Sequence, residues 1–120
     1  MALFDTTQIA LERAMSGAAA RQKALADNIA NANTPGYKRS DVDFHSALAK
    51  AVEGGADGRQ LESLTFSPTT DDSSSSRADG NNVDMDAEMA NLSENTLDYQ
   101  SIVAVSRARL QMLQSVLGSR

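Results

Sequence analysis

Three groups of side chains in this sequence have types that chemistry requires: a histidine beside two aspartates, a run of serines and an acidic segment. His45 follows Asp41 and Asp43, but the chain has no cysteine and no second histidine to complete a zinc shell. The serines at 73 to 76 have no histidine base near them in sequence. The segment DGNNVDMDAE, residues 79 to 88, does not fit the twelve-residue calcium loop. The sequence therefore predicts no catalytic residue, no metal site and no cofactor.

Length and composition predict one small, mostly helical domain. A chain of 120 residues buries only about two-thirds of its unfolded surface. Aromatic residues make up 4% of it, so alanine, leucine and methionine must supply a thin core. The net charge is −5 without a basic stripe, which argues against a nucleic-acid partner. We expect no membrane-spanning segment and no cleaved signal peptide, because acidic and basic residues interrupt every apolar run.

The C-terminal part of the chain has the strongest periodicity. Its heptad-spaced row, with steps of three and four, is Met85, Met89, Leu92, Thr96, Tyr99, Val103, Ser106, Leu110, Leu113 and Leu117. Such spacing is typical of a coiled-coil helix. With Gly118 as the C-terminal cap, the pattern predicts one helix over residues 84 to 117, about 50 Å long.

The N-terminal part repeats this spacing with smaller residues. The corresponding row is Phe4, Gln8, Leu11, Met15, Ala18, Gln22, Leu25, Ile29 and Ala32. Asp5 or Thr6 can cap the start of the helix. The helix should end by about Asn31 or Asn33, because the residue before Pro35 is disfavoured in the helical region.

The segment between the two helices has no clear period. Residues 40 to 52 fit a short helix or an extended arm, and Leu61, Leu64 and Phe66 fit a short strand. The stretch DDSSSSRADGNN has the low hydrophobicity of a disordered tether. We expect an all-α dominated fold: two long terminal helices packed as a coiled-coil pair, joined by a turn, a short arm and a flexible or weakly β middle segment. The corresponding divisions are residues 1 to 34, 35 to 83 and 84 to 120.

Two apolar rows in one chain imply partners. The helices can cover each other as an antiparallel pair, because each row must be buried against another helix. We expect the outer apolar positions to remain exposed and to be covered by other copies; they are Ile9, Ala19, Ala26, Ile102, Val105 and Val116. The methionines Met15, Met85, Met89 and Met112 fit either adaptable interfaces or an ordinary core.

The corner NIANANTPGYKR, residues 28 to 39, combines spaced amides with a turn. Thr34, Pro35, Gly36 and Tyr37 suit a type II turn, in which glycine supplies the positive φ. The amides of Asn28 and Asn31 share a helical face and can bond a neighbouring backbone, while Asn33 and Thr34 can cap the freed carbonyls and amides. The corner is either a contact surface in a polymer or a helix C-cap alone.

Three segments together resemble the axial proteins of the bacterial flagellum. LADNIANANTPGYKR, residues 25 to 39, is similar to the N-terminal signature that rod, hook and hook-associated proteins share. DVDF at 41 to 44 and DGNNVDMDAEMANLSENTLDYQ at 79 to 100 look most like the proximal rod members. The resemblance covers roughly residues 5 to 48 and 79 to 117 and leaves 53 to 78 without a match.

The resemblance implies a structural subunit without enzymatic activity. It implies export from the cytoplasm by the flagellar type III apparatus without a cleaved signal, and polymerisation into the hollow periplasmic rod of the basal body. The terminal helices would form an inner layer that lines the export channel, and the middle segment a smaller outer part. The implied partners are copies of the chain, other rod proteins, the ring or adaptor at the rod base and the export apparatus.

The residues that match this family form the expected subunit-interface signature. They are Asn28, Asn31, Asn33, Thr34, Pro35, Gly36, Tyr37, Asp41, Asp43, Phe44, Asn82, Asp84, Glu88, Leu92, Glu94, Asn95, Tyr99 and Gln100. The expected coiled-coil seam is Leu11, Met15, Leu25, Ile29, Met85, Met89, Val103, Leu110, Leu113 and Leu117. Two alternatives remain: a small secreted helical-hairpin effector or adaptor, and a different flagellar rod subunit.

Overall fold

The computed structural model of the protein describes residues 5 to 118. Over this range the fold is dominated by helices, as predicted, with two very short strands. The elements in chain order are α1 (Thr6–Ala30), β1 (Ser40–Asp41), α2 (Phe44–Glu53), α3 (Gly58–Glu62), β2 (Thr69–Thr70) and α4 (Met85–Gly118). The molecule is elongated, with principal extents of 67 × 26 × 16 Å. Phe4, the first residue of the predicted N-terminal row, lies outside the described residues.

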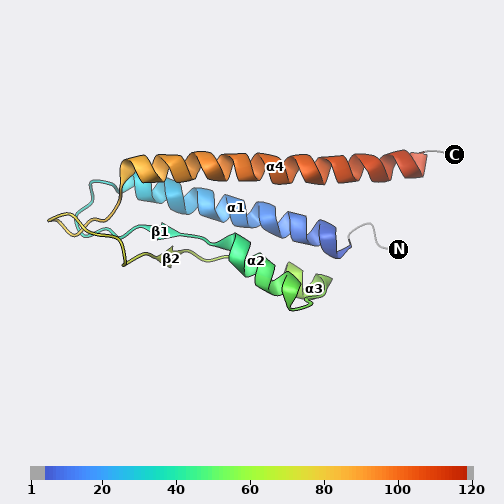
Figure 1. Ribbon diagram of the computed structural model, residues 1–120, viewed down its shortest axis with the longest axis horizontal. Helices are drawn as coiled ribbons and strands as arrows, with labels where there is room; N and C mark the ends of the chain where they lie inside the picture. The colour runs from blue at the N-terminus through green and yellow to red at the C-terminus, as the bar shows by residue number, and fades with distance from the viewer. Residues whose placement is uncertain (1–4, 119–120) are drawn as a thin grey trace.

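The two long helices α1 and α4 lie side by side and run in opposite directions (Figure 1). The start of α1 is capped by Asp5, whose side chain accepts a hydrogen bond from the Gln8 backbone N–H at 3.0 Å. α1 ends at Ala30, close to the expected boundary, and α4 begins and ends within one residue of the predicted limits. The predicted antiparallel pair is confirmed.

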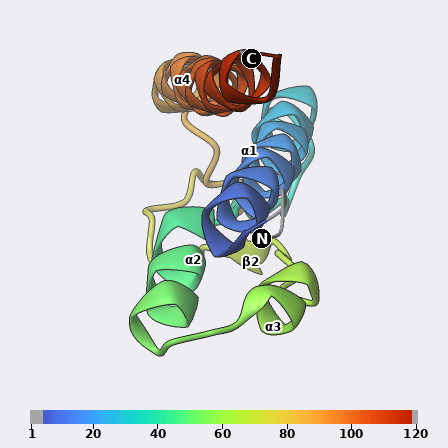
Figure 2. The same ribbon diagram turned by 90° about the vertical axis from the view of Figure 1, so that its right-hand side faces the viewer.

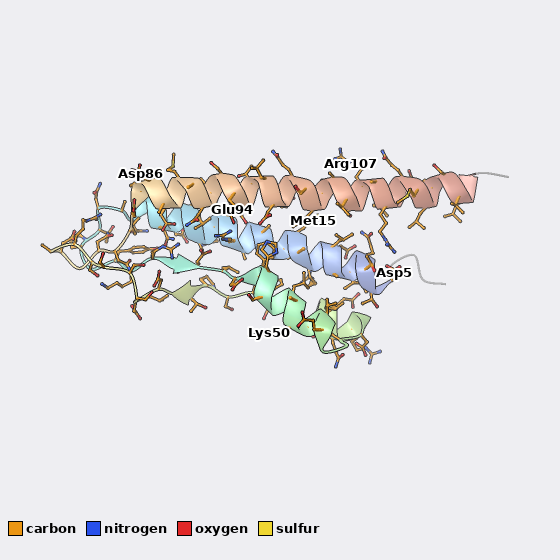
Figure 3. All side chains as sticks on the ribbon, viewed as in Figure 1. Asp5, Met15, Lys50, Asp86, Glu94 and Arg107 are labelled. Carbon is orange, nitrogen blue, oxygen red and sulfur yellow. The ribbon has the colours of Figure 1, made fainter. Side chains whose placement is uncertain are left out.

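The middle segment forms a second layer on α1. Figure 2 shows α1 between α4 on one side and α2 with α3 on the other. Ile9 is buried there, and its Cδ1 lies next to Gly58 at the start of α3. Our expectation that Ile9 is an exposed outer position is therefore wrong, because α3 covers it.

The predicted strand at Leu61, Leu64 and Phe66 is also wrong. Leu61 lies in α3 and is fully buried, whereas Leu64 and Phe66 follow in irregular chain. A capping box starts α3: Asp57 accepts from the Gln60 backbone N–H, and the Gln60 side chain accepts from the Asp57 N–H, both at 2.8 Å. This local pair of hydrogen bonds favours a short helix where we expected a strand.

The serine-rich stretch is folded onto the rest of the chain. β1 and β2 pair antiparallel, with Ser40 opposite Thr70. Directly after β2, the Asp71 backbone N–H donates to the Arg39 carbonyl at 2.8 Å. Arg77 donates from its guanidinium to the carbonyls of Val83 and Ala32. The disordered tether that we expected is thus an ordered loop, because long-range polar contacts hold it where apolar side chains are scarce.

The apolar core lies between α1 and α2. Ala14, Ala18, Ala24, Val42 and Phe44 form its buried cluster. Leu48, Phe66 and Ile102 pack against this cluster and are partly buried, so our expectation that Ile102 is an exposed outer position is also wrong. The small residues of α1 let the ring of Phe44 sit close to the helix axis.

The predicted apolar row of α4 contributes only in part to the contact with α1. The buried residues of α4 are Glu88, Asn95 and Ser106, all polar. Leu92, Val103 and Leu113 of the row are partly buried, whereas Met85, Met89, Tyr99, Leu110 and Leu117 are exposed. In α1, Leu25 is buried and Leu11, Met15 and Ile29 are partly buried. α4 is therefore turned so that much of its apolar row faces outward.

Candidate interface site

A buried carboxylate joins the start of α4 to the chain that follows α1. Glu88 is 1% exposed, and its Oε1 accepts from Arg39 Nε at 2.5 Å. Its Oε2 accepts from Asn28 Nδ2 at 3.0 Å. The hydrogen bond with Glu88 is the main cause that raises the pKa of Arg39 above its usual range. The hydrogen bonds between the two side chains offset the cost of burying them at the start of α4.

Arg39 also holds the loop that follows β2. Its Nη1 lies 3.1 Å from Asp71 Oδ2, and its backbone N–H donates to Asn82 Oδ1 at 2.7 Å. Next to it, Arg21 Nε donates to Asp41 Oδ1 at 2.9 Å. These ion pairs connect α1, β1, the loop and α4 around one cluster of charges. Sequence reasoning singled out neither arginine, because nothing local in the sequence marks such long-range pairs.

Asn28 bonds the backbone of β1 in both directions. Its Nδ2 donates to the Ser40 carbonyl at 2.7 Å, and its Oδ1 accepts from the Ser40 N–H at 2.9 Å. The Tyr37 hydroxyl adds a hydrogen bond to the same oxygen at 3.2 Å. The expected amide-to-backbone contact is present, and it lies within the chain.

Two glycine turns meet at the end of the molecule. The Tyr37 N–H donates to the Thr34 carbonyl at 3.2 Å and Gly36 has φ of 75°, which confirms the predicted type II turn. Gly80, in the second turn, has φ of 86°. The Gly36 N–H donates to the Asp79 carbonyl at 2.8 Å, so the turns are bonded to each other.

The cap at the end of α1 differs from our expectation. Asn33 is exposed, and the capping that we assigned to it is made by Asn81, whose Nδ2 donates to the carbonyls of Asn31 and Thr34 at 2.9 Å. Asn31 bonds its own helix through the Asp27 carbonyl at 2.8 Å. Asn81 belongs to the quoted segment DGNN. The Asn31 carbonyl that it caps lies 50 residues away along the chain, and no local sequence pattern predicts this contact.

Polar contacts continue along the α1–α4 pair. Gln8 Nε2 donates to Ser106 Oγ at 3.2 Å, and Asn95 Nδ2 donates to the Ala18 carbonyl at 2.9 Å. Near the start of α1, Arg109 forms an ion pair with Asp5. Hydrogen bonds made by side chains therefore join the two helices along most of the length of α1.

Comparison with known proteins identifies the family. A family model described as flagella basal body rod protein matches residues 10 to 38, which contain most of α1 and the Thr34–Tyr37 turn. The flagellar basal body rod protein FlgB of Escherichia coli K12 is 33% identical over 124 residues, covering 90% of each chain. FlgB of Bacillus subtilis is 34% identical and covers 98% of this chain and 97% of that protein. FlgB of Salmonella typhimurium is 36% identical and covers 88% of each.

The chain belongs to the FlgB family of flagellar basal body rod proteins. The resemblance to the proximal rod members is confirmed. Because these matches run through the middle of the chain, the family extends over residues 53 to 78, for which the motifs gave no match.

The FlgB-like signature residues differ in their exposure to solvent. Asn28, Phe44, Asn82, Glu88 and Asn95 are buried and fold the chain itself. Pro35, Glu94, Tyr99 and Gln100 are exposed, and Leu92 is partly buried. Asp43 accepts from the Ser46 backbone N–H in the first turn of α2, and Asp84 accepts from the Asp86 backbone N–H in the first turn of α4. Which of these residues contact another subunit stays a prediction.

The histidine and the aspartates of DVDFH have structural contacts. His45 Nε2 lies 2.9 Å from Asp98 Oδ2, and its ring stacks on Phe44 with centroids 4.2 Å apart. Asp41 is engaged by Arg21. Across residues 5 to 118, histidine and carboxylate side chains do not form a group that could hold a metal ion. Over the same range, no helix is long and apolar enough to cross a bilayer.

Proposed function

We propose that this chain polymerises through its terminal helices to form the proximal part of the hollow rod that serves as the flagellar drive shaft. As a member of the FlgB family, it is a structural subunit of the basal-body rod. The single observation that supports polymerisation best is the outward-facing apolar surface of α4. Along this helix Met89 is 54% exposed, Val116 72% and Leu117 65%.

The surface area of the chain supports a need for partners. It exposes 7700 Å², whereas a compact monomer of 12.7 kDa exposes about 6,200 Å². Its radius of gyration is 17.8 Å, against about 14 Å for a compact domain of this length. Large exposed apolar areas on a soluble chain mark contact sites. A shaft of repeated copies would cover this surface.

We infer the partners and the location from the family. The proposed partners are copies of the chain, other rod proteins, the ring or adaptor at the rod base and the export apparatus. The terminal segments 1 to 34 and 84 to 120 would form the inner layer, and residues 35 to 83 the outer part. The chain would act in the periplasmic rod after export without a cleaved signal. Its role is mechanical, and no residue is assigned to catalysis.

The first experiment is to find the chain in its assembly. Flagellar basal bodies are purified, the filaments are stripped, and peptides of this chain are measured by mass spectrometry. Abundant peptides that resist washing with salt are the expected result. If the protein is absent from basal bodies and is recovered from the medium, the secreted hairpin becomes the better reading.

A second experiment tests the role of the α4 surface. Replacing both Leu110 and Leu113 with aspartate should block rod assembly and swimming while expression in the cytoplasm continues, because charges in a helix–helix contact are costly. Replacing the exposed Ser115 with aspartate is the matched control and should leave swimming intact. Normal swimming of the double variant would contradict a structural role for this surface.

A further inference from the structure

A notch lies between α1 and α4 near the middle of the pair. It has a volume of about 310 Å³ and is lined by Ala18, Ala19, Gln22, Asn95, Thr96 and Tyr99. The two alanines come from α1, and their small side chains leave the space open. Thr96 and Tyr99 are exposed members of the heptad-spaced row of α4.

A buried amide at the notch lacks part of its hydrogen bonding. Asn95 is 1% exposed, and its Nδ2 donates to the Ala18 carbonyl and to Gln22 Oε1. Its Oδ1 is buried and has no hydrogen-bond partner within residues 5 to 118. A buried acceptor without a donor is costly, so a donor that reaches this oxygen when another chain packs into the notch would stabilise the contact.

The far end of α4 extends beyond the start of α1. α1 begins at Thr6, level with the Gln8–Ser106 hydrogen bond and the Asp5–Arg109 ion pair. α4 continues past this level to Gly118 (Figure 1), an overhang of residues 110 to 118 that is about 13 Å long. Its large apolar side chains are Leu110, Met112, Leu113, Val116 and Leu117, of which all but Leu113 are exposed.

We propose that the overhang of one copy seats in the notch of a second copy. Leu110, Leu113 and Leu117 have the spacing that forms one side of a helix, and Gln114 flanks that side. The apolar side would lie over Ala18 and Ala19, and the Gln114 side-chain amide would donate to Asn95 Oδ1. The inference rests on the proposed function and adds the pair of surfaces that meet.

The contact has a directional consequence. The notch and the overhang are different surfaces of one molecule, so each copy uses its overhang on one neighbour and its notch on another. Aligning the overhang with the notch shifts the second copy along α4 by roughly 17 residues, about 25 Å. A contact of this kind continues from copy to copy and does not close into a two-fold dimer.

Two full-length variants and their mixture test the proposal. Ala19→Trp fills the notch and keeps the overhang, whereas Leu110→Asp spoils the overhang and keeps the notch. Each variant alone should weaken self-association, measured by analytical ultracentrifugation, by at least about tenfold. In an equal mixture, the intact overhang of A19W can bind the intact notch of L110D. The mixture should therefore form dimers, and assemblies of more than two copies should not form.

The matched control is Ala49→Trp, at an exposed alanine on α2, which should associate like the original chain. Circular dichroism verifies that the helix content of all variants is equal. Equal association of A19W and A49W, a mixture that stays monomeric, or an original chain that stays monomeric up to its solubility limit would overturn the proposal. If A19W is still incorporated into basal bodies, the proposed rod function holds and the proposed notch contact is wrong. If the original chain is absent from basal bodies, the proposed function itself is wrong.

Discussion

Phe44 fills the space that a side chain on Gly17 would need: a Cβ built on Gly17 would lie 2.4 Å from Phe44 Cβ and 2.5 Å from Phe44 Cγ. The glycine is buried in the middle of α1, where it lowers helix propensity. Its absent side chain is what lets α2 begin directly against α1. The close approach of α2 to α1 therefore depends on this glycine.

Replacing Gly17 with alanine should destabilise the fold by about 1 to 3 kcal/mol, because the displacement of Phe44 outweighs the gain in helix propensity. Chemical denaturation followed by circular dichroism, in trimethylamine N-oxide solution to favour the compact state, measures this. Gly118→Ala is the control, since nothing lies within 4 Å of a Cβ there. Equal stability of the two variants would contradict the close contact.

Removing the Glu88 carboxylate should be costly. Glu88→Ala leaves Arg39 partly buried with fewer partners. We expect a loss of about 2 to 4 kcal/mol in the free energy of unfolding, measured by chemical denaturation in trimethylamine N-oxide solution. Glu94→Ala is the matched control, because its side chain is 68% exposed and lies 3.7 Å from Arg21. That control should change stability by less than about 0.5 kcal/mol. A similar effect of both variants would show that the buried pair has no special weight.

Stability should fall in acid. The Ser73 hydroxyl is the main group that lowers the pKa of Asp71, and the Gln8 backbone N–H is the main group that lowers the pKa of Asp5. A carboxyl whose pKa is lower in the folded chain adds stability above its unfolded pKa of 3.8, and this is lost as pH falls through the folded value. Unfolding measured from pH 6 to pH 2 should become easier below about pH 4. Asp71→Asn should flatten this dependence, and an unchanged pH profile would rule out a contribution of Asp71.

The Gly36 turn should tolerate asparagine better than alanine. Gly36 has φ of 75° and nothing within 4 Å of its Cβ position, so a substitution there is limited by backbone conformation alone. Alanine should cost about 1 kcal/mol, and asparagine less, because asparagine enters this region more readily. Thermal unfolding of the two variants side by side, in trimethylamine N-oxide solution, measures the difference. If alanine and asparagine are equally tolerated, the turn is not maintained in the monomer.

In dilute solution, we expect much of the isolated chain to be poorly ordered. The fully buried side chains of α4 are polar, and the overhang lies beyond the start of α1, so little apolar burial opposes the loss of conformational entropy. Circular dichroism and thermal unfolding of the dilute monomer test this. A cooperative transition with full helicity would contradict it. Helix content should rise with protein concentration or in trimethylamine N-oxide.

Local chemistry was readable from the sequence, and long-range pairing was not. The Asp5 cap and the Gly36 turn were predicted because their hydrogen bonds close within three residues. The orientation of α4 was not predicted. A heptad-spaced row indicates that a helix packs against other helices, but it does not say whether those helices belong to the same chain. Arg39 and Glu88 are 49 residues apart, and no periodicity connects a loop arginine to a helical carboxylate.

The hydrogen bond between the Gly36 turn and the turn at Gly80 has a consequence for chimeras made from related genes. A Cβ on Gly80 would lie 3.4 Å from Gly36 Cα, so the two turns touch at the backbone. Two stretches of the gene that are far apart thus encode two turns that must fit each other. A chimera that takes one stretch from this protein and the other from a distant relative would combine halves that were never selected together. Breakpoints outside both stretches would keep the two turns together.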